Sequence, residues 1–314
     1  AFMLKEGRTE AEPRVMSGET MSKVALISTV KTQLNHLHRF VAYHLMVGID
    51  EIILFCDDPL DEAVQAYAHH SSITIVPCSD EYWREQVGAK PVAIADRQIV
   101  NVNIGVKIAR AKGCTWMTHL DCDELINPVR DIRQVLDGTK ADVIRYNLLE
   151  AVPEKIEYDH IFMATLFRTQ PSKWQIWAAR ALCCSDAFYC DEYFRGHKSS
   201  KVMVRLSSKI LKHGIHRPDA YESDTVFCES DDLELLHFYS VGFSSWNERH
   251  ELRSIEIVDG RLPERRFSPS RERQLYEYYD AQRKGEAELM SLYKRIHFIP
   301  WPMKVILFLI GMLK

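Results

Sequence analysis

The chain has 314 residues, of which 46% are hydrophobic, so it can bury one large core or two smaller ones. Its 40 basic and 44 acidic residues nearly cancel, which excludes the overall positive field expected of a nucleic-acid-binding protein. The eight cysteines include no CxxC pair, and their scatter favours reduced thiols in a cytosolic protein over a zinc site.

Residues 1–21 form a polar leader without the apolar stretch of a secretory signal. We expect this leader to be disordered. Met21 stands directly before the first apolar run and is typical of a natural start, so the predicted fold begins at residue 22.

Strands and helices alternate through the next part of the chain. Apolar runs predict buried strands, and a helical spacing of apolar residues predicts helices. The predicted strands are Lys23 to Val30, Asp50 to Cys56 and Ser72 to Pro77, and the predicted helices are Lys31 to Gly48, Leu60 to His70 and Ala93 to Lys112. This alternation predicts βαβ units, and therefore an α/β fold with a mostly parallel, Rossmann-like sheet flanked by helices.

Polar residues at strand ends indicate where a ligand would bind. Ligands of parallel α/β sheets bind beyond the carboxyl ends of the strands. Thr29 and Lys31 mark the end of the first predicted strand, Asp57 follows the second, and a further strand from Trp116 runs into Asp121. We expect these ends to lie along one edge of the sheet.

Three carboxylates, Asp121, Asp123 and Glu124, follow the strand that begins at Trp116. Carboxylates repel one another, and hard divalent ions commonly bind one or two of them together with substrate phosphates. The Asp-x-Asp pattern therefore predicts a site for a metal-bound diphosphate. The alternative is an acidic loop that is merely solvated, because such a pattern also arises by chance.

An ordered series of motifs runs from the first strand to this acidic tip. Its residues are Thr29-Val30-Lys31, Leu34, Leu37, Phe40, Val41-Ala42-Tyr43-His44, Gly48-Ile49-Asp50, Arg97-Gln98, Asn101, Trp116 and Leu120-Asp121-Cys122-Asp123-Glu124-Leu125. The series resembles the family 2-like glycosyltransferases of the GT-A fold, in the subgroup with a DxD motif. The resemblance spans roughly residues 22 to 250 and depends on the order of its parts.

The resemblance implies a metal-dependent, inverting glycosyltransferase that moves a sugar from a UDP- or GDP-sugar to a glycan, lipid-linked or other hydroxyl acceptor. It implies that Asp121 and Asp123 hold Mn²⁺ or Mg²⁺. The residues it places around the nucleotide sugar are Thr29, Lys31, Asp57, Arg97, Gln98, Asp121 and Lys201. Charge builds on the departing diphosphate as the glycosidic bond breaks, and a metal there acts as a Lewis acid.

The second half of the chain should supply the acceptor side. An inverting transfer needs a carboxylate to take the proton of the acceptor hydroxyl, and the resemblance places this base at Asp191, with Glu192 as the second candidate. His216, in a Gly-x-His element, and His237 are predicted as further metal ligands. The aromatic residues between Ile161 and Tyr193 suit either an acceptor groove or ordinary core.

The last part of the chain differs in character. We expect a glycosyltransferase domain at residues 22–260 and a helical extension at 261–314, with a charged helix from about Arg271 to Ile296. After Pro302 the apolar tail is too short to span a membrane, which takes about 20 apolar residues. Residues 298–314 therefore either lie in the plane of a membrane, at the inner face for a cytoplasmic protein, or pack on the domain or on the second subunit of a homodimer.

Two other classes of protein share parts of this pattern. A non-catalytic protein of the same fold that binds nucleotide sugars or glycans is favoured by Thr32-Gln33, where the family often has Asn-Glu, and by the weakly defined base. A nucleotidyltransferase would want a Gly-rich phosphate loop after the first strand, and Val30-Lys31-Thr32-Gln33 contains no glycine.

Overall fold

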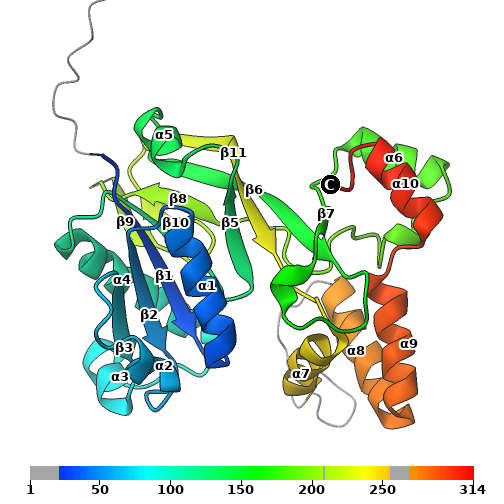
Figure 1. The fold of residues 1–314 in the computed structure, drawn as a ribbon, viewed down its shortest axis with the longest axis horizontal. Coiled ribbons are helices and arrows are strands. Elements are labelled where there is room, and N and C mark those ends of the chain that lie inside the picture. Colours follow the sequence, from blue (N-terminus) through cyan, green and yellow to red (C-terminus); the bar gives the residue numbers. More distant parts are fainter. Residues whose placement is uncertain (1–20, 208, 255–268) are drawn as a thin grey trace, which may run out of the picture.

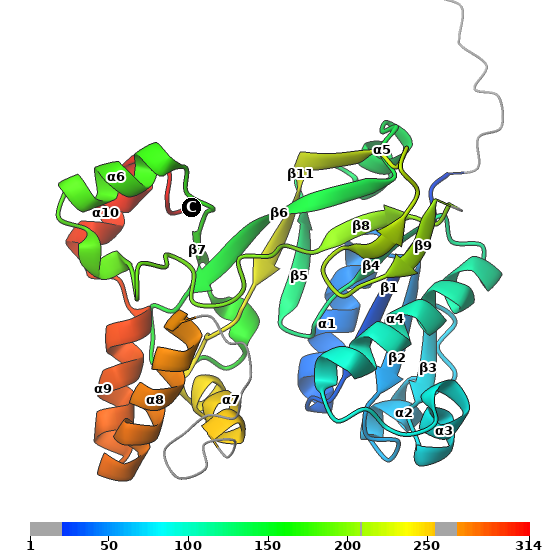
Figure 2. The same cartoon turned by 180° about the vertical axis from the view of Figure 1, so that it is seen from behind.

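The computed structural model describes residues 21–207, 209–254 and 269–314, shown from opposite sides in Figures 1 and 2. The predicted leader before Met21 and the arginine-rich link around Arg265 lie outside the described residues. The described parts form a larger α/β body beside a smaller body made mainly of helices (Figure 1).

The structure has the following elements. The strands are β1 (Val24–Val30), β2 (Glu51–Cys56), β3 (Ile73–Pro77), β4 (Trp116–His119), β5 (Glu124–Pro128), β6 (Val143–Val152), β7 (Leu166–Arg168), β8 (Val202–Arg205), β9 (Ile210–His213), β10 (Pro218–Tyr221) and β11 (Phe227–His237). The helices are α1 (Leu34–Met46), α2 (Glu62–Ala66), α3 (Asp80–Val87), α4 (Ile94–Ala111), α5 (Ile132–Asp137), α6 (Lys173–Ala181), α7 (Phe243–Ser254), α8 (Pro269–Lys284), α9 (Glu286–His297) and α10 (Trp301–Leu309).

Nine of the described strands form one sheet in the order β3-β2-β1-β4-β8-β6-β11-β5, with β7 paired to β6. Strands β3, β2, β1 and β4 run parallel, as the alternation predicted, and β6 and β11 are also parallel. Strands β8 and β5 enter antiparallel to their neighbours. The predicted α/β fold, a central sheet flanked by helices, is confirmed.

The parallel half of the sheet has a separate core on each face, because successive side chains of a strand point to opposite sides. Leu26 of β1 packs with Leu37 and Phe40 of α1, whereas its neighbour Ile27 packs in a second cluster with Val102 of α4. Every residue of β1 is buried, which explains why the apolar residues Val24 to Ile27 follow one another without alternation. The helices on the two faces thus hold the strand ends in fixed positions.

The charged segment predicted as one helix is two helices, and that prediction is wrong. Helix α8 ends before Gly285, whose φ of 108° lies in the left-handed region that glycine adopts without a steric cost. Helix α9 then folds back beside α8, and both pack on α7 (Figure 1). Trp246 of α7 is buried between Tyr278 of α8 and Tyr293 of α9, with both pairs of ring centroids 5.3 Å apart.

The apolar tail packs on the domain along one face. Leu307 and Met312 are buried in a cluster with Val152 of β6. Phe167 of β7 and Lys314 exchange two backbone hydrogen bonds of 2.9 Å. Packing on the domain therefore accounts for the inner face of residues 298–314.

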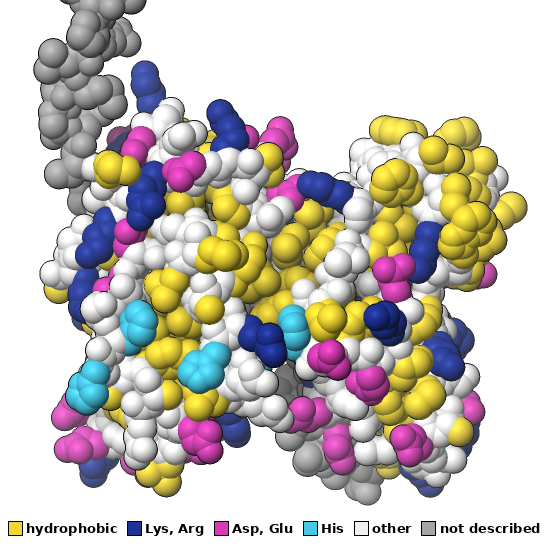
Figure 3. Space-filling model, in the orientation of Figure 1, with side chains coloured by type: hydrophobic (Ala, Val, Ile, Leu, Met, Phe, Trp, Pro, Cys, Tyr) yellow, Lys and Arg dark blue, Asp and Glu magenta, His cyan; other side chains and the backbone are white. Residues whose placement is uncertain are grey.

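The outer face of the same lobe is apolar and exposed. Gln175 of α6 donates a 2.8 Å hydrogen bond to the carbonyl of Ile310, so α6 and the end of α10 lie together, and Figure 3 shows the apolar surface over them at the upper right. Its large exposed side chains are Trp174 and Trp177 of α6 and Trp301, Phe308 and Leu309 of α10, and we call these five residues the apolar lobe surface. None of the described helices combines the length and the apolar character that crossing a membrane requires.

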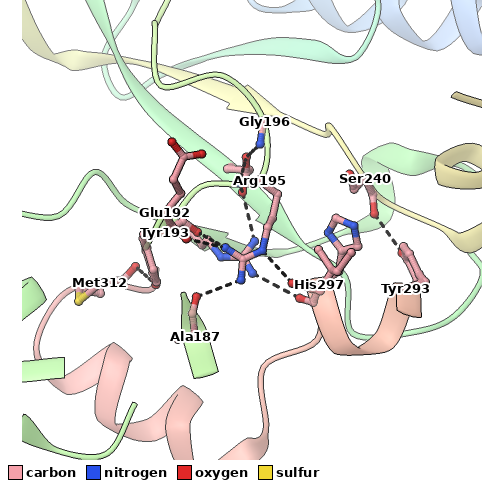
Figure 4. A network of polar contacts seen from close by, with 12 residues as sticks. Ala187, Glu192, Tyr193, Arg195, Gly196, Ser240, Tyr293, His297 and Met312 are labelled. Carbon is pink, nitrogen blue, oxygen red and sulfur yellow. Dashed lines mark hydrogen bonds and ion pairs between the residues drawn. The ribbon is translucent and has the colours of Figure 1, made fainter. Parts of the chain in front are cut away.

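A buried arginine ties the helical body to the sheet (Figure 4). Arg195 is 3% exposed, and its backbone N–H donates to Glu150 of β6 at 2.8 Å. Its guanidinium donates at 2.8–3.1 Å to the carbonyl oxygens of Ala187, Glu192, Tyr193 and Ile296. Burial lowers the pKa of Arg195 to about 9, and the side chain is still charged at neutral pH.

Candidate active site

The carboxyl ends of β1, β2 and β4 meet at a pocket of about 420 Å³. Five of the predicted residues line it: Thr29, Lys31, Asp57, Asp121 and Asp123. The remaining lining residues are Val30, Thr32, His36, Ile94, Cys122, Ile161, Ser245 and Arg249. The pocket therefore lies where parallel α/β sheets bind their ligands, with α7 of the helical body contributing the last two residues.

Asp121 is held by two side chains predicted as contacts of the nucleotide sugar, Gln98 and Lys201. Lys201 Nζ lies 2.9 Å from Oδ2, and Gln98 Nε2 donates to Oδ1 at 2.5 Å. Burial alone would raise the pKa of Asp121, but the Lys201 ammonium lowers it well below its ordinary value. Asp121 is therefore ionised at neutral pH, and the 37% exposure of its side chain leaves it open to a ligand.

Asp123 pairs with a second cation. Arg249 of α7 donates from Nη2 to Oδ2 at 2.6 Å, and His237 Nε2 lies 3.8 Å from the same oxygen. Burial alone would raise the pKa of Asp123, but the Arg249 guanidinium lowers it below its ordinary value. Burial lowers the pKa of His237 despite the nearby carboxylate, so Arg249 is the principal partner at neutral pH.

Glu124 differs from both aspartates although it adjoins them. It is 4% exposed, and its Oε2 accepts a 2.9 Å hydrogen bond from the backbone N–H of Asp121. Burial raises the pKa of Glu124 to about 8, even though Lys201 lies 3.5 Å away. The carboxylate charge open to the pocket is therefore that of Asp121 and Asp123.

Asp57, which follows β2 and lines the pocket, belongs to a cluster of charged side chains. Arg97 Nε lies 2.9 Å and Lys90 Nζ 3.4 Å from Oδ1 of Asp57. Arg97, predicted as a nucleotide contact, thus pairs with another predicted residue. Lys31 lies at the end of β1 and is exposed. Arg97 and Lys90 thus offset the charge of Asp57 without lining the pocket, whereas Lys31 lines it and offers positive charge to an anionic ligand.

Carboxylate oxygens such as those of Asp121 and Asp123 are the ligands that hard divalent ions prefer, and substrate phosphates commonly supply the rest. In this structure both oxygens of Asp121 bond to Gln98 and Lys201, and Oδ2 of Asp123 bonds to Arg249, so an ion would have to replace some of these contacts. In residues 21–207, 209–254 and 269–314, no group of three or more His, Cys, Asp or Glu side chains is arranged to hold an ion by itself. The predicted ligand His237 is near Asp123, but His216 lines a neighbouring groove. Burial and the nearby Lys201 lower the pKa of His216 to about 3.

The structure does not bring the predicted bases to the pocket. Asp191 is 89% exposed and pairs with Arg180 at 2.8 Å, and Glu192 pairs with Lys198 at 2.9 Å. Neither carboxylate is among the residues that line the pocket. Both follow Tyr189, whose ring is buried in the helical body, so that packing decides where this turn lies.

The aromatic segment between Ile161 and Tyr193 does not form one groove. Phe162 and Phe167 pack on Phe238, with ring centroids 5.1 and 5.7 Å apart, and are ordinary core. Trp174 and Trp177 belong to the apolar lobe surface.

Sequence reasoning missed Arg249, which lies on α7. An arginine on a mixed-charge helical face carries no local signal of a ligand site. The position of Arg249 beside Asp123 depends on α7 packing against the sheet, which local patterns do not report.

The fold and the site define a class: an α/β protein with a charged pocket at the strand ends, the place where such folds bind nucleotides. Two plant proteins are similar to the chain in sequence. It is 19% identical over 283 residues to the glycosyltransferase-like At2g41451 of Arabidopsis thaliana, covering 79% of this chain and 62% of that protein. It is 23% identical over 194 residues to the glycosyltransferase-like At3g57200 of the same species, covering 55% and 35%. The chain therefore spans less than two thirds of these relatives, and no protein-family model matches it.

Among solved structures, S. aureus TarS 1–349 resembles the chain with a TM-score of 0.37 and 10% identity, covering 83% of this chain and 71% of that one. The same protein in complex with UDP-GlcNAc gives a TM-score of 0.30 and 14% identity, covering 83% and 72%. Similarities of this size do not by themselves establish a common function.

Proposed function

We propose that the protein is a nucleotide-sugar-dependent glycosyltransferase with a GT-A-like fold, of the family 2-like subgroup with a DxD motif. The observation that carries the proposal is a pocket at the strand ends in which two ionised aspartates pair with Lys201 and Arg249. The similarity to two glycosyltransferase-like proteins supports the same class of reaction.

The proposed reaction breaks the bond between the sugar and the diphosphate, and negative charge then grows on the departing diphosphate. Lys31 and Arg249 line the pocket and offer positive charge to that group. Lys201 is 1% exposed and keeps Asp121 ionised and in place. Charges that are already in position stabilise a transition state because they need no reorganisation as the bond breaks.

We propose that Asp121 and Asp123 hold Mn²⁺ or Mg²⁺ together with the donor diphosphate. The ion would supply Lewis-acid stabilisation of the leaving group. The contribution of the protein is the pair of carboxylates, whose pKa values the neighbouring cations Lys201 and Arg249 keep low.

UDP or GDP should bind at least about tenfold more tightly with Mn²⁺ than after chelation, because the ion would bridge the diphosphate to Asp121 and Asp123. Isothermal titration calorimetry with EDTA-treated and Mn²⁺-loaded protein measures the difference. Equal binding in both conditions would contradict the metal dependence, and no binding of either nucleotide would contradict the proposed function. Binding of UDP- and GDP-sugars at full occupancy without hydrolysis or transfer would favour the non-catalytic binding protein.

The identity of the catalytic base and inversion of configuration at the transferred sugar stay predictions. Of the two candidates, Glu192 has a side chain that is 21% exposed, compared with 89% for Asp191. Neither carboxylate lines the pocket, so both remain candidates for the base. The rates of Glu192→Gln and Asp191→Asn test the two candidates, and the anomeric configuration of the product tests inversion.

We also propose that the apolar lobe surface contacts a membrane, which would place the protein at the inner face of the cytoplasmic membrane. Tryptophan is enriched at membrane interfaces, and short helices with an apolar face lie in the interface plane. The alternative is that this surface joins two copies in a homodimer, which sedimentation velocity would detect.

Replacing Trp177 and Trp301 by serine should abolish sedimentation of the protein with liposomes that contain anionic lipid. The side chains are 72% and 74% exposed, so the fold should be unaffected. Deleting the tail is a poorer test because Leu307 is fully buried. A matched control is Leu211→Ser, which removes a 66% exposed leucine from β9 in the other body. If the unmodified protein never sediments with the liposomes, the membrane contact is contradicted.

A further inference from the structure

A second hollow lies beside the pocket and is not used by the proposed donor site. It is a groove of about 830 Å³ between β10 with its preceding turn and the strands β6, β8 and β11. Its lining residues are Ile99, Val143, Arg145, Ser199, Ser200, Val202, Ile215, His216, Arg217, Pro218, Asp219, Tyr221, Phe227, Cys228 and Glu229. We call it the hairpin groove.

The hairpin groove and the pocket share a wall. Ser200 lines the groove, while Lys201 next to it contacts Asp121, because successive side chains of an extended chain point to opposite sides. On α4 the same division holds: Ile99 lines the groove, and Gln98 donates to Asp121. A ligand in the groove would therefore contact Ser200 and Ile99, and each of these residues is next in sequence to a residue that bonds to Asp121.

The hairpin that borders the groove is held in place. Asn103 of α4 donates to the carbonyl of His213 at 2.7 Å and accepts from its N–H at 3.0 Å. In the turn, a Cβ on Gly214 would lie 2.4 Å from Asp219 Oδ1 and 2.6 Å from the carbonyl oxygen of Arg217, so the turn packs in a way that glycine alone permits. The groove is thus formed before a ligand enters, as is usual for small-molecule sites.

Aromatic rings lie along the groove. Tyr221 and Phe227 are 48% and 47% exposed, and their ring centroids are 4.9 Å apart. Sugar rings have apolar faces that pack on such side chains. Within the described part of the chain, the Ser200 hydroxyl and His216 Nδ1 have no hydrogen-bond partner, but both atoms are buried in the wall of the groove. The exposed rings are therefore the feature that a carbohydrate would complement.

The charges around the groove cancel. Arg145 and Arg217 are opposed by Asp219 and Glu229, with Arg145 Nη1 3.3 Å from Glu229 Oε1. An anionic or a cationic ligand would therefore gain little from this lining, whereas carboxylate and guanidinium groups both bond to sugar hydroxyls. The charge balance favours a neutral ligand.

We propose that the hairpin groove binds an uncharged oligosaccharide, with Tyr221 and Phe227 packing on its sugar rings. The assignment of this oligosaccharide as the acceptor depends on the proposed glycosyltransferase function, but its binding does not.

The test uses the full chain and a panel of neutral oligosaccharides: cellotriose, chitotriose, lactose, mannobiose and xylotriose. Saturation-transfer NMR should detect at least one of them, and Tyr221→Ala and Phe227→Ala should each weaken its binding about tenfold, the usual size of an aromatic packing contribution. Leu211→Ala, a matched control on the neighbouring strand with a 66% exposed side chain, should change nothing.

Two results would overturn the inference: no panel member binds, or the aromatic variants bind as well as Leu211→Ala does. Binding of UDP and GDP is measured on the same variants and should stay unchanged, because Tyr221 and Phe227 do not line the pocket. Oligosaccharide binding without nucleotide binding would leave the groove assignment standing and contradict the proposed function. Nucleotide binding without oligosaccharide binding would contradict the groove assignment and leave the proposed function standing.

Discussion

Asp123→Asn should lower turnover of the sugar donor at least about a hundredfold while the protein stays folded. Asparagine keeps the size of the side chain but loses the charge that would bind a divalent ion. Its partner Arg249 is 25% exposed, whereas Lys201, the partner of Asp121, is 1% exposed, so the loss of stability should be smaller than in Asp121→Asn. The measurement is the rate of donor hydrolysis or transfer, with circular dichroism to check folding.

Asp123 is a cleaner target than Asp121 for a structural reason. Asp121→Asn would leave Lys201, which is 1% exposed, without its nearest carboxylate. Glu124 would still lie 3.5 Å from this buried charge, but the loss of the closer partner should destabilise the protein, so lost activity in that variant would mix catalysis with unfolding. Asp58→Asn is the matched control, because Asp58 is exposed and adjoins the pocket residue Asp57. An unchanged rate in Asp123→Asn would remove the DxD assignment.

Arg195→Met should lower the free energy of unfolding by about 3–5 kcal/mol, since it removes the donor to four carbonyl oxygens in the interior. Methionine fills much of the same volume, so the loss would report mainly the hydrogen bonds and the charge. Urea denaturation followed by tryptophan fluorescence measures it, because Trp246 is buried in the helical body.

The control for this prediction is Arg180→Met. Arg180 is 48% exposed and pairs with the exposed Asp191, an interaction worth at most about 1 kcal/mol. Equal losses in the two variants would show that Arg195 does not join the helical body to the sheet. A second, earlier unfolding transition in Arg195→Met would show that the helical body separates first.

Local patterns predicted the parallel half of the sheet well. Strand β1 is buried on both faces, so apolar residues follow one another from Val24 to Ile27, and α1 shows the helical period because one face packs on the sheet. The prediction of a single long helix after residue 270 is wrong, because Gly285 ends α8 with a left-handed backbone conformation. Local patterns could not predict that the tail packs on β7 and α6, because this packing depends on contacts between segments far apart in sequence.

The candidate site divides in the same way. Thr29, Lys31, Asp57, Asp121 and Asp123 follow strand ends, so their convergence on one pocket could be predicted from topology. The base could not be predicted, because the turn at Asp191 is placed by the burial of Tyr189 in the helical body. Arg249 could not be predicted either, since it reaches Asp123 from α7, over a hundred residues further along the chain.

By itself the sequence determined the alternation of strands and helices and the acidic tip after β4, because both arise from residues that are neighbours in the chain. The tertiary structure alone decided which cations face Asp121 and Asp123, and it alone produced the hairpin groove and the apolar lobe surface. These features join side chains that are far apart in sequence, and their position depends on how the helical body packs on the sheet.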